Sequence, residues 1–468
     1  MRISHKCMCL LNYILIFALV SGCAADRSAN VITGAGSPIA ESAPPPAVPE
    51  VSAVKPEKEL EANPGGTLTL RQALSLALVG NPELAGFSLE KRVSEAKALQ
   101  AGLLPNPEIG VDVEQFGGSG EFKDLKTAQT TILLSQLIEI GGKRSKRARV
   151  AALEKELAGW DYETKRLDVL TDVAKSFVEV LSGQELVAQN DELVRLSEQV
   201  LDTVSERVKA GKVSPLEETK ARVTLSNTRI GLEQAKSDLR AARKKLSATW
   251  GGTSSSFAGV EGELSTLVPV PSAEELNRLV LQNPDVARWV KEMEQRRAVL
   301  ESEKAKGIPD ITLSGGLQRF HETDDSALVV GISVPLPLFD RNQGGILAAR
   351  YKLAKAREEA RAAEVKAGAG LGESYQALGF AYAEAKSLND EVLPAAQTAF
   401  DAASEGYREG KFDYLELLDS QRTLFEAKGK YVKALSAYHK AKADVERLVG
   451  QPLGADIQTP ETNEKGNR

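Results

Sequence analysis

The sequence has 468 residues, of which 42% are hydrophobic and 26% charged, with a formal net charge of −6. This composition is typical of a folded protein, and an acidic balance gives no broad attraction to nucleic acid. With three histidines and three cysteines, no spacing matches a structural or catalytic metal set. The sequence contains no nucleophile triad, phosphate loop or dinucleotide motif, so it predicts neither an enzyme nor a metal or cofactor site.

The N-terminus predicts export and a lipid anchor. Arg2 and Lys6 precede an apolar run at residues 10–20, which is too short to span a bilayer, and small residues follow it. This pattern is typical of a secretory signal peptide, assigned to residues 1–22. The sequence Val-Ser-Gly before Cys23 resembles a bacterial lipobox, which implies a diacylglycerol and fatty acyl group on Cys23. An ordinary signal with an incidental cysteine is the alternative.

The segments that flank the folded region are predicted to be disordered. The residue after the cysteine is Ala24. In bacterial lipoproteins an aspartate at this position would indicate retention at the inner membrane, so the lipobox resemblance indicates the outer membrane. Residues 23–66 are rich in proline and have no apolar period, which predicts a lipidated tether. Residues 451–468 are predicted to be a disordered tail.

The rest of the sequence contains one unit twice. Several motifs recur about 200 residues later: Asn81-Pro82 as Asn283-Pro284, Gly211 as Gly410, and Gly251 as Gly450. Two copies are too few for a solenoid and predict a pseudo-symmetric protomer. The repeats are assigned to residues 67–251 and 271–450, with a linker at 252–270.

Each repeat is predicted to be mainly α-helical. Apolar residues at helical spacing predict helices at 70–78, 84–104, 143–210 and 215–250 in the first repeat. The counterparts are 273–281, a helix ending near Lys306, a long helix from about Gln343 and a return helix after Gly410. A helix over 143–210 would be about 100 Å long. Two shorter helices beside one long helix predict an extended helical barrel or bundle.

Four short segments read as strands in two hairpins, at about 107–138 and 309–336. The strands are 108–114, 131–138, 311–318 and 328–334. All but 131–138 alternate apolar and polar residues clearly, which is typical of transmembrane β-strands. In the first strand this alternation predicts that Glu108, Asp112 and Glu114 face a channel lumen. A half-buried soluble sheet is the alternative.

Four strands cannot close a barrel within one chain. A lipid-exposed sheet edge would leave its backbone hydrogen-bonding groups without partners. We therefore expect the barrel to close between copies of the chain.

Several segments resemble the TolC-like outer-membrane factors of tripartite RND efflux systems: LTLRQALSLALVGNPEL, AGLLPNPEI, GKVSPLEETKAR and GKFDYLELLDSQRTLF. The segment from Glu114 to Arg147 is similar to the heavy-metal cation branch, of the cobalt–zinc–cadmium type. The resemblance implies a homotrimer with a shared twelve-stranded barrel and a long periplasmic α-barrel, docked by a periplasmic adaptor and an inner-membrane pump. Such a protein would conduct divalent metal cations passively from periplasm to exterior. The alternatives are a multidrug or organic-compound duct and a structural periplasmic coiled-coil lipoprotein.

The same resemblance places a periplasmic gate near Gly410. It implies gate residues Tyr407, Glu416 and Asp419, with Glu217 as the counterpart in the first repeat. Glu416 and Asp419 share a helix face and would form acidic rings that attract cations, or they are a solvated acidic surface. Phe412 stands where the family has a gate arginine.

A basic run opens the long helix of the first repeat. It comprises Lys143, Arg144, Lys146, Arg147 and Arg149. We expect contact with phospholipid head groups at the inner leaflet, and a solvated helix start is the alternative.

Overall fold

The computed structural model describes residues 66–255 and 257–453. The predicted leader, Cys23, the tether up to residue 65 and the tail after residue 453 lie outside this part. No helix in the described ranges combines the length and apolar character needed to cross a bilayer.

The two repeats have the same order of elements. The first contains α2 (Leu70–Gly80), α3 (Pro82–Ala101), β2 (Glu108–Glu114), β3 (Gln129–Ile138), α4 (Lys143–Lys209) and α5 (Pro215–Ala248). The second contains α6 (Ala273–Val280), α7 (Pro284–Lys306), β5 (Ile311–Phe320), β6 (Asp325–Ser333), α8 (Gln343–Ser387), α9 (Leu393–Glu409) and α10 (Tyr414–Val449). Two short 3₁₀ turns, Gly120–Lys123 and Leu125–Thr127, lie between β2 and β3. The predicted helices and strands are confirmed, with end points that differ by a few residues.

The repeated Asn-Pro motif joins two helix ends in each repeat. The Asn81 side chain accepts from the Leu84 amide at 2.8 Å and donates to the Thr249 carbonyl at 2.7 Å. In the second repeat, the Asn283 side chain donates to the carbonyls of Arg447 and Leu448 at 2.7 and 3.0 Å. Each asparagine therefore caps the start of one helix and binds the carbonyls at the end of another, which leaves fewer terminal backbone groups unsatisfied.

A small parallel sheet of β1 (Thr67–Thr69) and β4 (Gly259–Glu261) holds the start of the first repeat. β4 lies within residues 252–270, which the sequence predicted only as a linker. Phe257, Val260 and Leu264 in that segment are buried in the largest hydrophobic cluster. Gln184 of α4 donates to the Val260 carbonyl at 3.0 Å and accepts from its amide at 2.8 Å. The segment is therefore a packed part of the fold.

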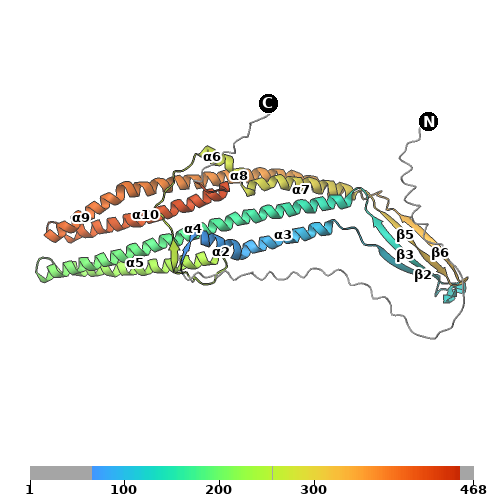
Figure 1. Ribbon diagram of the computed structural model, residues 1–468, viewed down its shortest axis with the longest axis horizontal. Coiled ribbons are helices and arrows are strands. Elements are labelled where there is room, and N and C mark those ends of the chain that lie inside the picture. Colours follow the sequence, from blue (N-terminus) through green and yellow to red (C-terminus); the bar gives the residue numbers. More distant parts are fainter. Residues whose placement is uncertain (1–65, 256, 454–468) are drawn as a thin grey trace, which may run out of the picture. The chain divides into compact units, whose positions relative to one another are not determined.

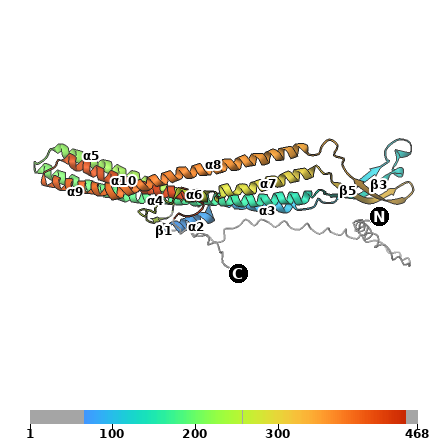
Figure 2. The same cartoon turned by 90° about the horizontal axis from the view of Figure 1, so that it is seen from above.

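The helices pack side by side around α4, which is 67 residues and about 100 Å long. Helix α4 packs against α3 and α7 in its first half and against α5 and α10 in its second half (Figures 1 and 2). The second repeat divides the equivalent length between α8 and α9, which meet at a π-helical turn, Leu388–Val392. Pro394 follows this turn. A proline cannot donate to the carbonyl four residues earlier and its ring crowds it, so a wider turn at this point is expected.

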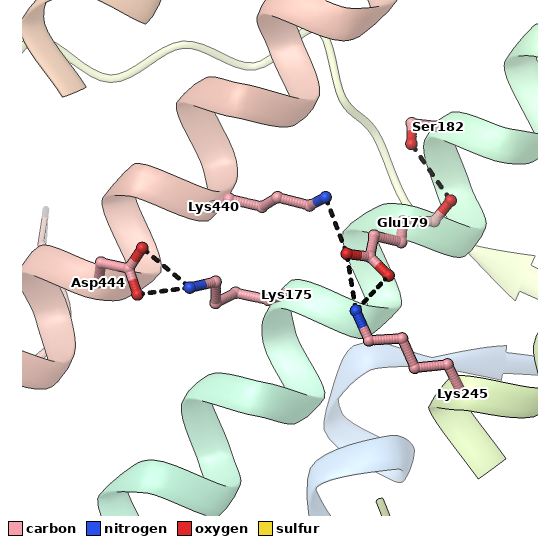
Figure 3. A network of polar contacts seen from close by, with 6 residues as sticks. All are labelled: Lys175, Glu179, Ser182, Lys245, Lys440 and Asp444. Atoms are coloured by element: carbon pink, nitrogen blue, oxygen red, sulfur yellow. Dashed lines mark hydrogen bonds and ion pairs between the residues drawn. The ribbon is translucent and has the colours of Figure 1, made fainter. Parts of the chain in front are cut away.

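Alternating ion pairs connect α4 to α10 (Figure 3). Lys175 of α4 binds both Asp444 carboxylate oxygens, at 2.7 and 3.0 Å. One turn further along α4, Glu179 accepts from Lys440 of α10 at 2.9 Å and from Lys245 of α5 at 2.8 Å. Burial alone would raise the pKa of Glu179, but the two lysines outweigh it and hold this pKa below its usual value. We call Lys175, Glu179, Lys440 and Asp444 the charge ladder.

The four longer strands form one antiparallel sheet in the order β2-β3-β5-β6. The two hairpins meet where β3 pairs with β5, and Ile132 lies opposite Leu317 there. In the described part of the chain, no strand pairs with the outer edge of β2 or of β6. The sheet is therefore open at both edges in a single chain.

Candidate functional site

The sheet has one mainly apolar face, and the opposite face is mixed, with Leu133, Leu137 and Val329 among its polar residues. The register places apolar side chains of all four strands on the same face: Ile109, Val111, Val113, Ile132, Leu134, Leu313, Leu317, Leu328, Val330 and Ile332. All are exposed in the single chain, with Leu328 and Val330 each 82% exposed. Soluble proteins rarely leave so large a continuous apolar patch uncovered. The length of the strands and the alternation of apolar and polar residues along them are typical of a sheet that faces lipid.

The opposite face carries the predicted lumen residues. Glu108, Asp112 and Glu114 of β2 are exposed there, and their direct neighbours on β3 are Ser135, Thr131 and Gln129. The pairing is therefore polar with polar across the strands. The register brings the three acidic residues to the face that would line a closed barrel.

Two glycine turns lie together at the ends of the helical hairpins. Helix α4 ends before Gly211, with φ of 68°, and α9 ends at Gly410, with φ of 79°. This left-handed conformation is strained for residues with a side chain, which explains glycine at both positions. Ser214 and Asp413 then cap α5 and α10 by accepting from the Leu216 and Glu416 amides at 3.2 and 3.0 Å. The repeats thus provide two equivalent tips.

The Tyr407 side chain connects these tips. It is 1% exposed, its hydroxyl donates to the Glu217 carboxylate of α5 at 3.4 Å, and its ring packs edge-on against Tyr414. Burial, followed by the Glu217 charge, raises the pKa of Tyr407 to about 12. The tyrosine is therefore a neutral hydrogen-bond donor at physiological pH. The structure brings together two of the four predicted gate residues.

The sequence analysis missed the third member of this contact, Arg207 of α4. Its guanidinium donates to the Tyr407 carbonyl and lies 4.4 Å from the Tyr407 ring centroid, in a cation–π arrangement. The resemblance places a gate arginine at the position of Phe412, in the second repeat. Phe412 instead covers Gly406, the counterpart of Arg207 in the duplication. We call Arg207, Glu217 and Tyr407 the tip cluster.

Glu416 and Asp419 lie apart from the tip cluster. Both are exposed on α10, and no hydrogen bond or ion pair joins either side chain to another described residue. The counterpart of Asp419 in the first repeat is Lys220. Arg422, one turn after Asp419, pairs with Glu426 at 2.7 Å. The exposed surface at the tips of one chain therefore carries charges of both signs. The acidic rings expected from three copies stay a prediction.

The basic run of α4 has two structural members. Lys143 pairs with Asp310 at 2.7 Å. Arg147 pairs with Glu139 at 2.6 Å and donates to the Ala101 carbonyl at 2.9 Å. These contacts fix the start of α4 to the segments that connect the sheet with the helices.

Among the described residues, no three His, Cys, Asp or Glu side chains are grouped so that they could hold a metal ion. Residues 73–252 and 276–451 match the family described as outer membrane efflux protein. The chain belongs to this family. It is 36% identical to the cobalt-zinc-cadmium resistance protein CzcC of Cupriavidus metallidurans, over 82% of this chain and 91% of that protein. The nickel and cobalt resistance protein CnrC of the same organism is 29% identical, over 62% and 67% of the two chains.

Solved structures show the fold of this outer-membrane efflux protein. A membrane protein from Pseudomonas aeruginosa superposes with a TM-score of 0.72 at 16% identity, covering 82% of this chain and 90% of that one. This likeness and the family match confirm the predicted fold class at the level of one chain: a mainly helical, internally duplicated protomer with a four-stranded sheet, of the kind found in outer-membrane efflux proteins. They also confirm the expected location in the outer membrane.

The tip cluster gives a testable prediction. We expect Arg207→Ala to raise the conductance of the reconstituted protein about tenfold, because it removes a charged hydrogen bond that holds two helix tips together. Single-channel recording in planar bilayers measures this. Arg408→Ala is the matched control, since within residues 66–255 and 257–453 Arg408 pairs only with Glu405 of its own helix, at 2.9 Å. Equal conductance of the two variants would contradict a holding role for Arg207.

Proposed function

We propose that three copies of the chain form a closed duct that conducts divalent heavy-metal cations from the periplasm to the exterior. The apolar face that continues across a sheet with two unpaired edges carries this proposal. In lipid, each edge needs a partner strand. Pairing β6 of one copy with β2 of the next supplies that partner and gives a twelve-stranded barrel in a trimer.

The helices at the sides of the protomer support this closure. Helix α3 packs on α4, and α8 packs on α7 and α10. Other sides of these helices expose apolar residues, such as Leu89 and Leu99 on α3 and Tyr351 and Val365 on α8. A trimer would cover them, because α8 of one copy would lie beside α3 of the next.

Cysteine cross-linking tests the closure. The natural cysteines are Cys7, Cys9 and Cys23. The first two lie in the predicted leader and the third would be acylated, so the natural chain can receive Val111→Cys in β2 with Leu328→Cys, Val330→Cys or Ile332→Cys in β6. We expect one of the three pairs to give covalent dimers and trimers on non-reducing gels. Gly331→Cys, on the other face of β6, is the control. If no pair cross-links between chains, the proposed closure is wrong.

Metal cations are the proposed cargo, because the similar proteins CzcC and CnrC are named for resistance to such metals. Glu108, Asp112 and Glu114 would line the upper lumen, and Glu416 and Asp419 the entrance, where carboxylates raise the local cation concentration. Tyr407 and Glu217 would hold the entrance closed. Transport is passive, with no catalytic step. A periplasmic adaptor and an inner-membrane RND pump would supply selection and energy, and acylated Cys23 would anchor the chain.

A resistance assay tests the cargo. We expect a deletion strain to become sensitive to cobalt, zinc and cadmium but not to a panel of drugs. The wild-type gene should restore growth. Drug sensitivity without metal sensitivity would instead favour a duct for organic compounds.

A second prediction concerns the charges at the entrance. Glu416→Gln with Asp419→Asn should lower the cation selectivity of the channel in bilayers, because the entrance then loses two negative charges per subunit. The control is Glu358→Gln with Glu364→Gln on α8, which removes the same charge elsewhere.

A further inference from the structure

A cavity between α4 and α7 is lined by three positively charged side chains, two from the first repeat and one from the second. Its volume is about 350 Å³, and Lys146 and Arg149 of α4 and Arg297 of α7 line it together with Leu153. Its position on α4 separates it from Lys143 and Arg147, which point to a different cavity and are paired there. The basic run therefore has a structural part and a part that opens to this cavity.

The three positively charged side chains form no direct ion pair in the described chain, although the pKa of Glu301 is lowered by Lys304 and, to a smaller extent, by the nearby Lys146. Among the described residues, no carboxylate lies within ion-pair distance of Lys146, Arg149 or Arg297. Two acidic residues also line the cavity, but each pairs with a lysine of its own helix. Glu294 is 3.2 Å from Lys291, and Glu301 is 2.6 Å from Lys304. Positive charge thus remains available in the cavity.

The cavity lies close to the sheet along the chain. Helix α4 begins five residues after β3 ends at Ile138, and Arg149 is about 9 Å along α4 from Lys143. If the strands span the bilayer, as the proposed function states, these side chains lie just beyond the hydrocarbon core, at the depth of the lipid head groups. Long basic side chains can extend toward that interface.

We propose that this cavity binds the phosphate group of an anionic phospholipid in the inner leaflet of the outer membrane. Arginine can bind two phosphate oxygens at once, and lysine adds a point charge. Basic pockets between helices at a membrane surface bind phospholipid head groups in this way. The site rests on the proposed function only for its depth in the membrane.

Native mass spectrometry of the full-length protein in detergent, titrated with phosphatidylglycerol, tests the site. We expect affinity to fall about fivefold per cation removed, hence roughly a hundredfold in Lys146→Gln, Arg149→Gln, Arg297→Gln. The control removes three exposed, unpaired cations of α5 and α10: Arg240→Gln, Lys244→Gln, Lys430→Gln. It should bind like the wild type. Arg297→Gln alone, expected to lose about fivefold, serves if the triple variant does not assemble.

Two results would overturn the site. One is a triple variant, or failing that Arg297→Gln, that binds phosphatidylglycerol as tightly as the control does. The other is displacement of the lipid from the wild type by millimolar inorganic phosphate, which would identify a site for free anions. Failure of the proposed function is distinguishable, because a wild-type protein that does not conduct in bilayers can still be titrated with lipid.

Discussion

Replacing Gly316 with alanine is expected to remove most of the assembled protein from the outer membrane. Gly316 lies in β5 opposite Leu133 of β3, at the junction between the two hairpins. A Cβ atom there would lie 1.9 Å from the Ile132 carbonyl oxygen and 3.0 Å from the Leu133 Cα. Because both are backbone atoms of the partner strand, neither can rotate away. We expect a cost of about 3 kcal/mol, as for severe overpacking, and separation of the hairpins.

Gly315 is the matched control for this prediction. It is the preceding residue, it lies on the apolar face opposite Leu134 and Val330, and a Cβ there would have no neighbour within 4 Å. Gly315→Ala should therefore assemble normally. The fraction of heat-modifiable protein in outer-membrane extracts measures both variants. Normal assembly of Gly316→Ala would show that β3 and β5 do not approach in this register.

The sequence predicts the elements well where local chemistry determines them. Helix α4 begins at the predicted Lys143 because Gly142 before it takes a left-handed conformation, with φ of 71°. Strand β2 has the predicted bounds because side-chain alternation is complete there. Strand β6 begins three residues earlier than predicted, at Asp325. Its first residues pair with the end of β5, and backbone pairing extends beyond the apolar pattern.

Contacts between the repeats could not be predicted in the same way. Arg207 reaches Tyr407 across 200 residues, and Lys143 reaches Asp310. Strands β1 and β4 have three residues each, too few to show a period. The one available signal for Arg207 was the duplication itself, because aligning the repeats places it opposite Gly406.

Reversing one charge of the ladder is expected to destabilise the helical part by about 2 kcal/mol. Lys175→Glu would place a carboxylate beside Asp444 and one turn from Glu179 (Figure 3). The pair it replaces is about one-third exposed, so solvent screening limits the loss of attraction to about 1 kcal/mol, and repulsion adds a similar amount. Denaturant unfolding in detergent measures the change. Asp444→Lys added to Lys175→Glu should recover about 1 kcal/mol.

The control for the ladder is Lys304→Glu, which reverses a pair within α7 alone, 2.6 Å from Glu301. It should destabilise the protein by less than half as much and show no coupling to residue 444.

Low pH should also weaken the ladder and lower the stability of the helical part. The pKa of Glu179 is lowered in the folded state, so its stabilisation is present above its usual pKa of about 4.5. That stabilisation is lost as pH falls through the lowered value.

The order of charges in the ladder opposes sliding of α4 against α10, which bears on how the proposed gate would open. Lys175 and Glu179 are four residues apart on α4, and Lys440 and Asp444 are four apart on antiparallel α10. A slip of one turn, about 5.4 Å, would bring Lys440 beside Lys175 in one direction and Asp444 beside Glu179 in the other. Sliding is thus opposed both ways, and opening of the tip cluster should proceed by bending beyond the ladder. The double variant Lys175→Glu, Asp444→Lys keeps the pair between residues 175 and 444 but leaves two glutamates on α4 facing two lysines on α10, so either slip would bring opposite charges together. It should therefore lose the opposition to sliding and conduct differently from the wild type, although it is more stable than Lys175→Glu alone. Wild-type conductance of the double variant would refute this register role.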